Sequence, residues 1–336
     1  MTLASAEKIA IVAIGRNEGE RLKSCLSAAF AGCETVVYVD SGSQDASASF
    51  ARSAGCHVVE LDPARPFSAA RARNEGFACA MEHAPDAALI QFVDGDCDLA
   101  EGWLRQARAV LADRSDVGMV RGQLREINPE ASVYNRLCDL EWRQTPGEIG
   151  ACGGIFMVRT EIFKAVGGFR PDVIAAEDDE FCIRVRGLGS KILMIDAPMA
   201  SHDAAMRHFS QWWRRARRAG HAYAQVAALH GSGEDRYFVA ERRKIWIWGL
   251  ALPAVALLLA PVTYGISLAA LLGVYLLQLA HICGGVSKRG WKAKDAWTYA
   301  FFSVISRFPG LQGLIGYRWR QVRGQTPEII EYKRNA

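Results

Sequence analysis

Over the first 206 residues, apolar runs with the spacing of strands alternate with segments that have the spacing of helices. Four runs rich in Val and Ile are predicted as β-strands, and they cover residues 9–14, 35–39, 57–61 and 88–93. Three intervening segments have helical periodicity with few helix breakers, and they cover residues 20–30, 46–54 and 68–82. This alternation predicts an α/β fold, Rossmann-like, with a mostly parallel central sheet flanked by helices.

A later stretch, residues 245–287, contains no Asp, Glu, Lys or Arg in 43 consecutive positions. As one helix it would be about 64 Å long, roughly twice the ~30 Å hydrocarbon core of a bilayer. We therefore predict a C-terminal transmembrane helical hairpin, with spans 245–263 and 264–283 and a turn near Pro261 and Gly265. The alternative is a buried helical pair in a large soluble domain.

The flanks of this stretch are basic, with Arg242, Arg243 and Lys244 before it and Lys288 and Arg289 after it. The positive-inside rule then places both ends of the hairpin in the cytoplasm. A third apolar segment, residues 296–317, is interrupted by a charge and a proline, so we expect it to lie in the membrane interface. Residues 1–8 have no basic leader, which predicts that the first domain stays in the cytoplasm.

Charge divides the chain in the same place. The whole sequence is 50% hydrophobic and 23% charged, which excludes a disordered or collagen-like chain. Residues 1–206 carry a net charge of −9, whereas residues 207–336 carry +13. We predict four parts: a catalytic domain (1–206), basic amphipathic juxtamembrane helices (207–244), the hairpin (245–287) and a basic interfacial C-terminal segment (288–336). Nine cysteines without a CxxC pair read as free thiols in a reducing compartment.

Carboxylates follow three of the predicted strands. Glu18 comes after the first, Asp40 after the second, and Asp94 and Asp96 after the fourth. Ligands bind beyond the carboxyl ends of strands in such sheets. Glu18 and Asp40 can accept from ribose hydroxyls or base N–H groups, and the two aspartates flank a glycine turn that can place two oxygens on one hard cation.

Six stretches together resemble the GT-A fold, family 2 glycosyltransferases. They occur in the order expected for that family and span roughly residues 8–205. They read VAIGRNE (12–18), VDSGSQD (39–45), ARNEG (72–76), DGD (94–96), GGIFMVR through VGGF (153–169) and EDDEFCIR (177–184). The resemblance implies a nucleotide-diphosphate sugar as donor, a Mg²⁺ or Mn²⁺ ion, and inversion at the anomeric carbon.

The resemblance also assigns roles to particular residues. Asp178 takes the position of the catalytic base, and Glu177 orients Asp178 or the acceptor; repulsion between neighbouring carboxylates could raise one pKa. Asp96, with Asp94 nearby, holds the metal that neutralises the leaving diphosphate.

Two further residues keep open alternatives. In the family a histidine near position 202 helps bind the metal or the diphosphate, and His202 follows the predicted strand 191–195 by a few residues; a histidine in a surface turn is the alternative. Arg73 is a candidate diphosphate contact because a guanidinium binds phosphate oxygens in a forked geometry. Arg71 is the alternative, and either arginine could be purely structural.

The basic stretch after the catalytic domain contains Gln211 followed by Trp-Trp-Arg-Arg. Processive synthases of the family carry a Gln…Arg-Trp motif there, and the different order here favours transfer of single sugars. We expect the arginines to dock on anionic lipids, and the predicted anchor beside them disfavours nucleic-acid binding.

The sequence thus predicts a glycosyltransferase at the inner (cytoplasmic) membrane, acting on a lipid-linked or polysaccharide-precursor acceptor, with membrane lipids as further partners. The rivals are a GT-A-like sugar nucleotidyltransferase, which would release pyrophosphate, and a non-catalytic membrane adaptor that keeps the fold.

Overall fold

The structure is a computed structural model that describes residues 7–233 and 235–324. The chain divides into two compact units. The first contains residues 1–128 and 141–204, and the second contains residues 129–140 and 205–336. The last twelve residues of the predicted C-terminal segment, 325–336, lie outside the described residues. Residues 129–140, which contain most of one helix, therefore belong to the second unit although they lie in the sequence between strands of the first.

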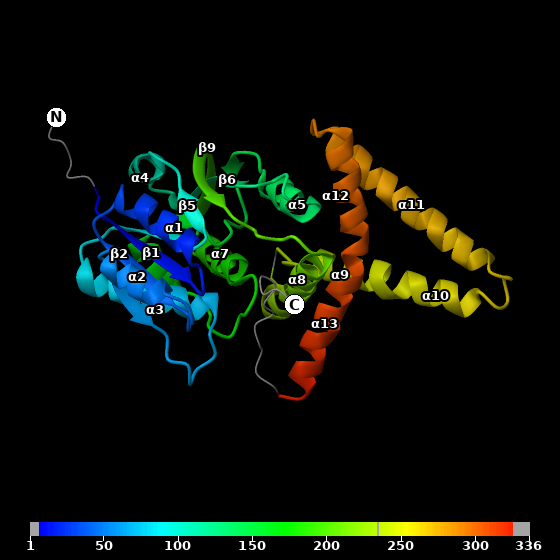
Figure 1. The fold of residues 1–336 in the computed structure, drawn as a ribbon. Coiled ribbons are helices and arrows are strands. Elements are labelled where there is room, and N and C mark those ends of the chain that lie inside the picture. The colour runs from blue at the N-terminus through cyan, green and yellow to red at the C-terminus, as the bar shows by residue number, and fades with distance from the viewer. Residues whose placement is uncertain (1–6, 234, 325–336) are drawn as a thin grey trace. The chain divides into compact units, whose positions relative to one another are not determined.

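The first unit is built around one mixed sheet (Figure 1). Its strands follow in the order β3-β2-β1-β4-β8-β6-β9-β5, and β7 pairs with β9. They are β1 (Ile9–Gly15), β2 (Val36–Asp40), β3 (His57–Glu60), β4 (Leu89–Asp94), β5 (Cys97–Leu99), β6 (Val117–Glu126), β7 (Gly147–Glu148), β8 (Phe156–Arg159) and β9 (Lys191–His202). The half formed by β3, β2, β1 and β4 is wholly parallel, as the strand–helix alternation predicts.

Helices cover both faces of this sheet. They are α1 (Glu20–Phe30), α2 (Ser47–Ser53), α3 (Ala69–His83), α4 (Trp103–Asp113), α6 (Thr160–Val166) and α7 (Glu177–Gly187). Successive side chains of a strand point to opposite faces, so β1 sends Ile11 into the core beneath α1 and α4 and Val12 into the core beneath α3, α6 and α7. A strand buried on both faces reads as a continuous apolar run, and this explains why the first strand was so clear in the sequence.

The strand β9 differs from the sequence prediction. We expected a strand over residues 191–195, the apolar part of this segment. The strand continues to His202, and Pro198 lies where the register between β6 and β9 shifts. Proline is tolerated at bulges because the ladder bond it cannot donate is already missing there. His202 therefore ends a strand of the sheet and does not lie in a surface turn.

The second unit is helical. It contains α5 (Val133–Trp142, shared at its end with the first unit), α8 (Phe209–His230), α9 (Val239–Trp246), the π-helix η1 (Ile247–Ala251), α10 (Leu252–Leu259), α11 (Ile266–Ser287), α12 (Ala293–Ile305) and α13 (Arg307–Val322). Arg136 of α5 binds both carboxylate oxygens of Asp295 in α12, at 2.6 and 3.0 Å. This ion pair ties the inserted helix to the C-terminal helices.

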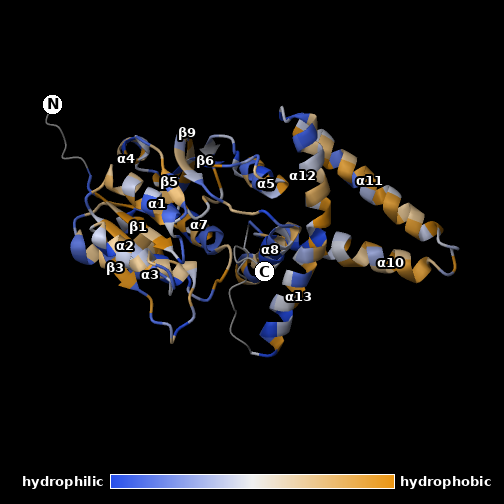
Figure 2. Cartoon of the chain, viewed as in Figure 1, coloured by the Kyte–Doolittle hydropathy of each residue, from blue (hydrophilic) through white to orange (hydrophobic). Residues whose placement is uncertain are grey.

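Helices α10 and α11 form an antiparallel pair around a turn at residues 260–265, where the sequence predicted one. Ser267 donates to the carbonyl of Ala256 across the pair, at 2.7 Å. Hydrophobic residues run along both helices (Figure 2), and large apolar side chains on them are exposed, among them Leu258 and Leu277 at 77% and 72%. Among the described residues, α11 is the one helix both long and apolar enough to cross a bilayer.

Candidate active site

Three of the predicted site carboxylates come from adjacent strand ends. In the parallel ladders Gly15 of β1 lies opposite Asp40 of β2, and Ile14 of β1 lies opposite Asp94 of β4. The loop that leaves β1 carries Glu18. The sheet thus brings Glu18, Asp40 and Asp94 to one edge.

Asp40 is buried and its carboxylate already has partners. The hydroxyl and backbone N–H of Ser43 donate to it at 2.5 and 2.7 Å, and the Tyr38 hydroxyl donates at 3.2 Å. Glu18 forms an ion pair with Arg21 at 2.9 Å. An ionised carboxylate has about four acceptor positions, so Asp40 has little capacity left for the ribose or base contact that we expected. In this structure it shapes the loop after β2.

Asp96 and His202 lie together although 106 positions separate them. The Nε2 atom of His202 is 3.2 Å from Oδ2 of Asp96. The ends of β5 and β9 create this approach, because Cys97 pairs with His202 across an antiparallel ladder. Asp96, Cys97 and His202 offer ligand atoms that all lie within 4.8 Å of one another, the arrangement needed to hold a metal ion.

The chemistry of these donors suits a hard or borderline divalent ion. A carboxylate oxygen and an imidazole nitrogen are ordinary ligands of Mn²⁺. Burial raises the pKa of the Cys97 thiol well above its usual range, and sulfur is a soft ligand that suits Mg²⁺ or Mn²⁺ poorly. The residues present therefore fit such an ion through Asp96 and His202, with positions left for oxygen ligands from a substrate.

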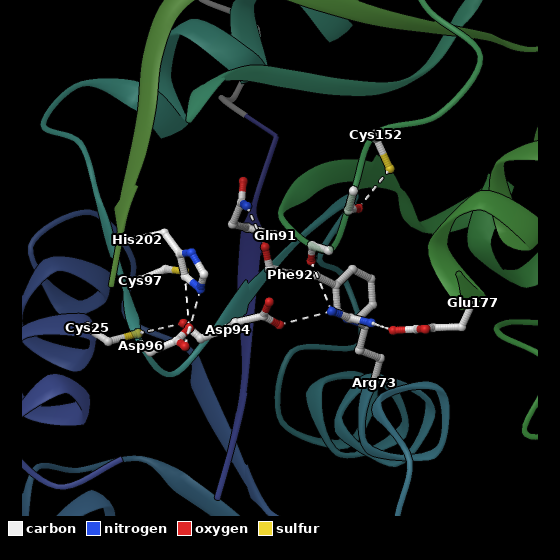
Figure 3. Close-up of polar contacts among 12 residues, drawn as sticks. Cys25, Arg73, Gln91, Phe92, Asp94, Asp96, Cys97, Cys152, Glu177 and His202 are labelled. Atoms are coloured by element: carbon white, nitrogen blue, oxygen red, sulfur yellow. Dashed lines mark hydrogen bonds and ion pairs between the residues drawn. The ribbon is translucent and has the colours of Figure 1, made fainter. Parts of the chain in front are cut away.

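Asp94 is held away from that group by an arginine. The Arg73 guanidinium donates to Oδ1 of Asp94 at 2.9 Å and to Oε1 of Glu177 at 2.8 Å (Figure 3). It also donates to the carbonyl of Gly154 at 3.3 Å. A Cβ at position 154 would lie 2.6 Å from Nη2 of Arg73, so a side chain there would have to displace the guanidinium.

The position of Arg73 favours the structural role that the sequence left open beside a diphosphate contact. Its side chain is 3% exposed and two carboxylates bind it. Although burial opposes the charged form, Asp94 and Glu177 raise the pKa of this guanidinium. The alternative, Arg71, is also engaged: it pairs with Glu75 at 2.6 Å and donates to the carbonyls of Asp62 and Arg65. Both arginines hold the protein together in this structure.

Asp178 stands beside Glu177 at the start of α7. Burial and, after it, the negative charge of Glu177 raise the pKa of Asp178 to about 6, and the charge of Arg73 works against this rise. The sequence suggested that repulsion between neighbouring carboxylates would act here, but burial is the larger cause. A carboxylate with this pKa is ionised at neutral pH and is more basic than an exposed aspartate.

Two residues of this region gave no signal in the sequence. Arg121 of β6 is buried and feels the charge of Asp178, and among the described residues its one hydrogen bond goes from Nε to the carbonyl of Gly122, at 3.2 Å. Glu126 lies opposite His202 in the β6–β9 ladder, and burial raises its pKa. Neither residue belongs to a motif, so the strand pairing alone reveals them.

Comparisons with known proteins give one matching family model and several solved structures of similar fold. The sequence model "Glycosyl transferase family 2" matches residues 10–167, which contain Glu18, Asp40, Arg73, Asp94 and Asp96. This match favours glycosyl transfer over nucleotidyl transfer and over a silent scaffold. No curated protein sequence matches the chain.

Among solved structures, the mannosyltransferase PcManGT from Pyrobaculum calidifontis, in complex with GDP-Man and Mn²⁺, has a TM-score of 0.58 at 17% identity, covering 94% of this chain and 88% of that one. Residues 1–349 of S. aureus TarS, in complex with UDP, give a TM-score of 0.51 at 15% identity, covering 95% and 92%. The present chain spans 42% of a longer S. aureus TarS chain.

The glucosyl-3-phosphoglycerate synthase from Mycobacterium tuberculosis, in complex with Mn²⁺, UDP and glucosyl-3-phosphoglycerate, has a TM-score of 0.50 at 16% identity, covering 68% of this chain and 82% of that one. At these identities the likeness concerns the fold, which is the GT-A fold.

Proposed function

The chain belongs to the family 2 glycosyltransferases, and on this premise we propose that it transfers a single sugar, with inversion, from a nucleotide-diphosphate sugar to a membrane-associated acceptor. One observation carries the proposal: the Asp96–His202 pair lies two residues along the chain from Asp94, and Arg73 binds both Asp94 and Glu177, the neighbour of Asp178. A metal-binding group and a base in one site are what displacement of a diphosphate by a hydroxyl requires.

We assign the base to Asp178. An acceptor hydroxyl is a weak nucleophile at neutral pH, so a carboxylate must take its proton while the new bond to the anomeric carbon forms. The raised pKa of Asp178, about 6, makes it a stronger proton acceptor that is still ionised at pH 7. Glu177 contributes to that pKa, and the bond from Arg73 fixes its position.

We assign stabilisation of the leaving diphosphate to Asp96 and His202. These residues would hold Mg²⁺ or Mn²⁺, which when bound supplies positive charge to the leaving diphosphate. We propose that Asp94 acts through Arg73, because its Oδ1 atom is engaged by that guanidinium. Two of the structural neighbours contain Mn²⁺ together with a nucleotide or nucleotide sugar, which supports the same requirement here.

We further propose that the pair α10–α11 enters the inner membrane, with the catalytic unit on its cytoplasmic face. A helical pair buried in a soluble domain would hide its leucines, whereas Leu258 and Leu277 are mostly exposed. Residues 245–259 make only about 22 Å of helix, short of the ~30 Å hydrocarbon core. The long arm is α11, with 22 residues. A lipid-linked or polysaccharide-precursor acceptor follows from this location.

The chemistry is tested with the purified full chain in mild detergent. A panel of nucleotide sugars is supplied with Mn²⁺, and the released product is identified. A nucleoside diphosphate is expected, whereas pyrophosphate would show nucleotidyl transfer and no release with any donor would contradict a transferase. The metal requirement is read from the same assay after chelation.

The membrane proposal is tested by flotation with phosphatidylglycerol-containing vesicles. The wild type is expected to float, and a variant with Leu258→Gln, Leu272→Gln and Leu277→Gln is expected to stay at the bottom of the gradient, because polar side chains remove the favourable burial of these positions in hydrocarbon. Donor hydrolysis should persist in the variant, since none of the three leucines belongs to the site. Equal flotation of both proteins would overturn the proposal.

A further inference from the structure

Two buried arginines feel the charge of Asp178, and they differ in their partners. Arg73 binds the carboxylates of Asp94 and Glu177. Arg121 of β6 is 4% exposed, and among the residues that the structure describes it forms no ion pair. Its one hydrogen bond there goes from Nε to the carbonyl of the next residue, at 3.2 Å. Buried charges are normally paired, so Arg121 is an exception that requires an explanation.

The end of the Arg121 side chain is open to an incoming group. Its Nη1 and Nη2 atoms make no hydrogen bond within the described part of the chain. They are also not among the polar atoms that are sealed from solvent without a partner, so both nitrogens still reach solvent while the rest of the side chain is enclosed. Burial lowers the pKa of this guanidinium, and the charge of Asp178 works against that effect. A bound anion would replace part of the solvation that this cation has lost.

Arg121 and the base border the same small region. A Cβ at Gly153 would lie 3.8 Å from Nη1 of Arg121 and 3.9 Å from Oδ2 of Asp178. Gly153 has a φ of +73°, in the left-handed region that favours glycine, so no side chain fills the space beside either group.

The two charged groups nevertheless do not pair with each other, since no ion pair joins Arg121 to Asp178. A guanidinium bound to that carboxylate would lower its pKa and occupy the lone pairs with which it accepts a proton. The separation therefore leaves Asp178 able to act as a base and leaves Arg121 able to bind another anion.

We propose that Arg121 binds a phosphate group carried by the sugar acceptor. The inference rests on the proposed function and names the chemical class of its acceptor: a phosphate ester with a free hydroxyl a few bonds from the phosphate. The hydroxyl donates to Asp178, and the phosphate oxygens accept from the guanidinium, whose N–H groups match pairs of such oxygens. Phosphate is the anion that membrane lipid headgroups carry, which agrees with a membrane-associated acceptor.

The position of Arg121 assigns it to the acceptor and not to the donor. In a displacement with inversion the attacking hydroxyl and the leaving diphosphate lie on opposite sides of the anomeric carbon. We assign the diphosphate to Asp96 and His202, whereas Arg121 borders the base that activates the hydroxyl. An anion held by Arg121 therefore lies on the side of the attacking group.

The test measures by calorimetry the binding of sn-glycerol 3-phosphate, a small probe with both groups, to the full chain in mild detergent with Mn²⁺. The wild type is expected to bind it more tightly than inorganic phosphate, which lacks the hydroxyls. Arg121→Gln is expected to bind it about tenfold or more weakly, because a charge-assisted contact is lost. Arg125→Gln is the matched control, since it removes the same charge from an exposed position of the same strand, and it should bind like the wild type.

Three outcomes overturn the inference: no binding of sn-glycerol 3-phosphate, equal binding of inorganic phosphate, or equal effects of the two substitutions. Arg121→Lys keeps the charge without the forked geometry and should weaken binding by a smaller factor; if Arg121→Gln fails to fold, this variant decides. The donor panel separates the two levels. Release of a nucleoside diphosphate by a chain that does not bind the probe contradicts this inference alone, whereas binding without any release contradicts the proposed transfer.

Discussion

In the first unit the buried Arg73 has two carboxylate partners, whereas in the second unit the partly buried Arg307 has no ion pair among the described residues. Arg73 is almost wholly buried and binds two carboxylates. Arg307 lies at an apolar cavity and has no ion pair among the described residues. The second unit also exposes large apolar side chains on α10 and α11, while the apolar residues of the sheet are buried. The first unit supplies the counter-charges of Arg73, and the second exposes apolar surface on α10 and α11.

The largest expected effect concerns the base within the first unit. Asp178→Asn should lower the rate of sugar transfer by about 10²–10⁴-fold, the usual contribution of a positioned general base. The neighbouring Asp179→Asn provides the control, since it changes the same residue type one position further along α7. Circular dichroism should show both variants folded. Full activity of Asp178→Asn would move the base elsewhere.

Removing Arg73 tests how much its buried ion pairs contribute to the stability of the first unit. Arg73→Met removes the guanidinium that binds the buried Glu177 and Asp94, and this should lower the free energy of unfolding by about 3–5 kcal/mol. Arg52 pairs with Glu60 at the surface, so Arg52→Met should cost about 1 kcal/mol or less. Chemical unfolding in detergent, followed by circular dichroism, measures both. Equal losses would mean that the buried pairing has no special role.

The metal-binding group gives a smaller, graded effect. His202→Ala should raise the Mn²⁺ concentration needed for half-maximal activity by about 10–100-fold, the range seen when support for a metal is removed. Cys97→Ser should change it little, because sulfur is a soft ligand that suits Mn²⁺ poorly. Titration of activity with Mn²⁺ after chelation distinguishes the two. A large effect of Cys97→Ser with none of His202→Ala would reverse the ligand assignment.

The smallest expected effect is a shift in pH dependence. The raised pKa of Asp178 means that the base is protonated below pH of about 6, so activity should rise with pH through that value. Glu177→Gln removes a neighbouring negative charge and should move the rise to lower pH. The same carboxyl binds more protons folded than unfolded, so its contribution to stability falls as pH rises from about 4 to 6. A pH profile of kcat/KM that stays unchanged in Glu177→Gln would contradict this coupling.

The sequence predicted the elements of the first unit because their signals are local. Strand β1 is apolar on both faces, and α1 begins and ends at the residues that the pattern indicated, Glu20 and Phe30. The structure brings the motif residues Glu18, Asp40 and Asp94 to one edge of the sheet. What the sequence missed depends on contacts between distant segments: Arg73 meets Glu177 across 104 positions, and no pattern within either segment shows that the guanidinium already has partners.

The hairpin shows the same limit. The uncharged run indicated two helices and the turn between them. The predicted first span, residues 245–263, was too long, because α10 ends at Leu259. The end of a helix without charged residues or strong caps depends on packing that the hydropathy pattern does not encode. His202 is similar, since a bulge at Pro198 lets β9 continue to it.

The π-helix η1 also decides how closely two helices of the second unit approach. A π-turn accommodates one residue more than an α-turn, so it widens the helix at one point without rotating the helices on either side of it by a full residue step. At this point a Cβ on Gly249 would lie 2.7 Å from the carbonyl oxygen of Arg307. Deleting one residue within Ile247–Ala251 would restore a regular helix and remove the wide turn that now lies against α13, while α9 and α10 would keep their phase.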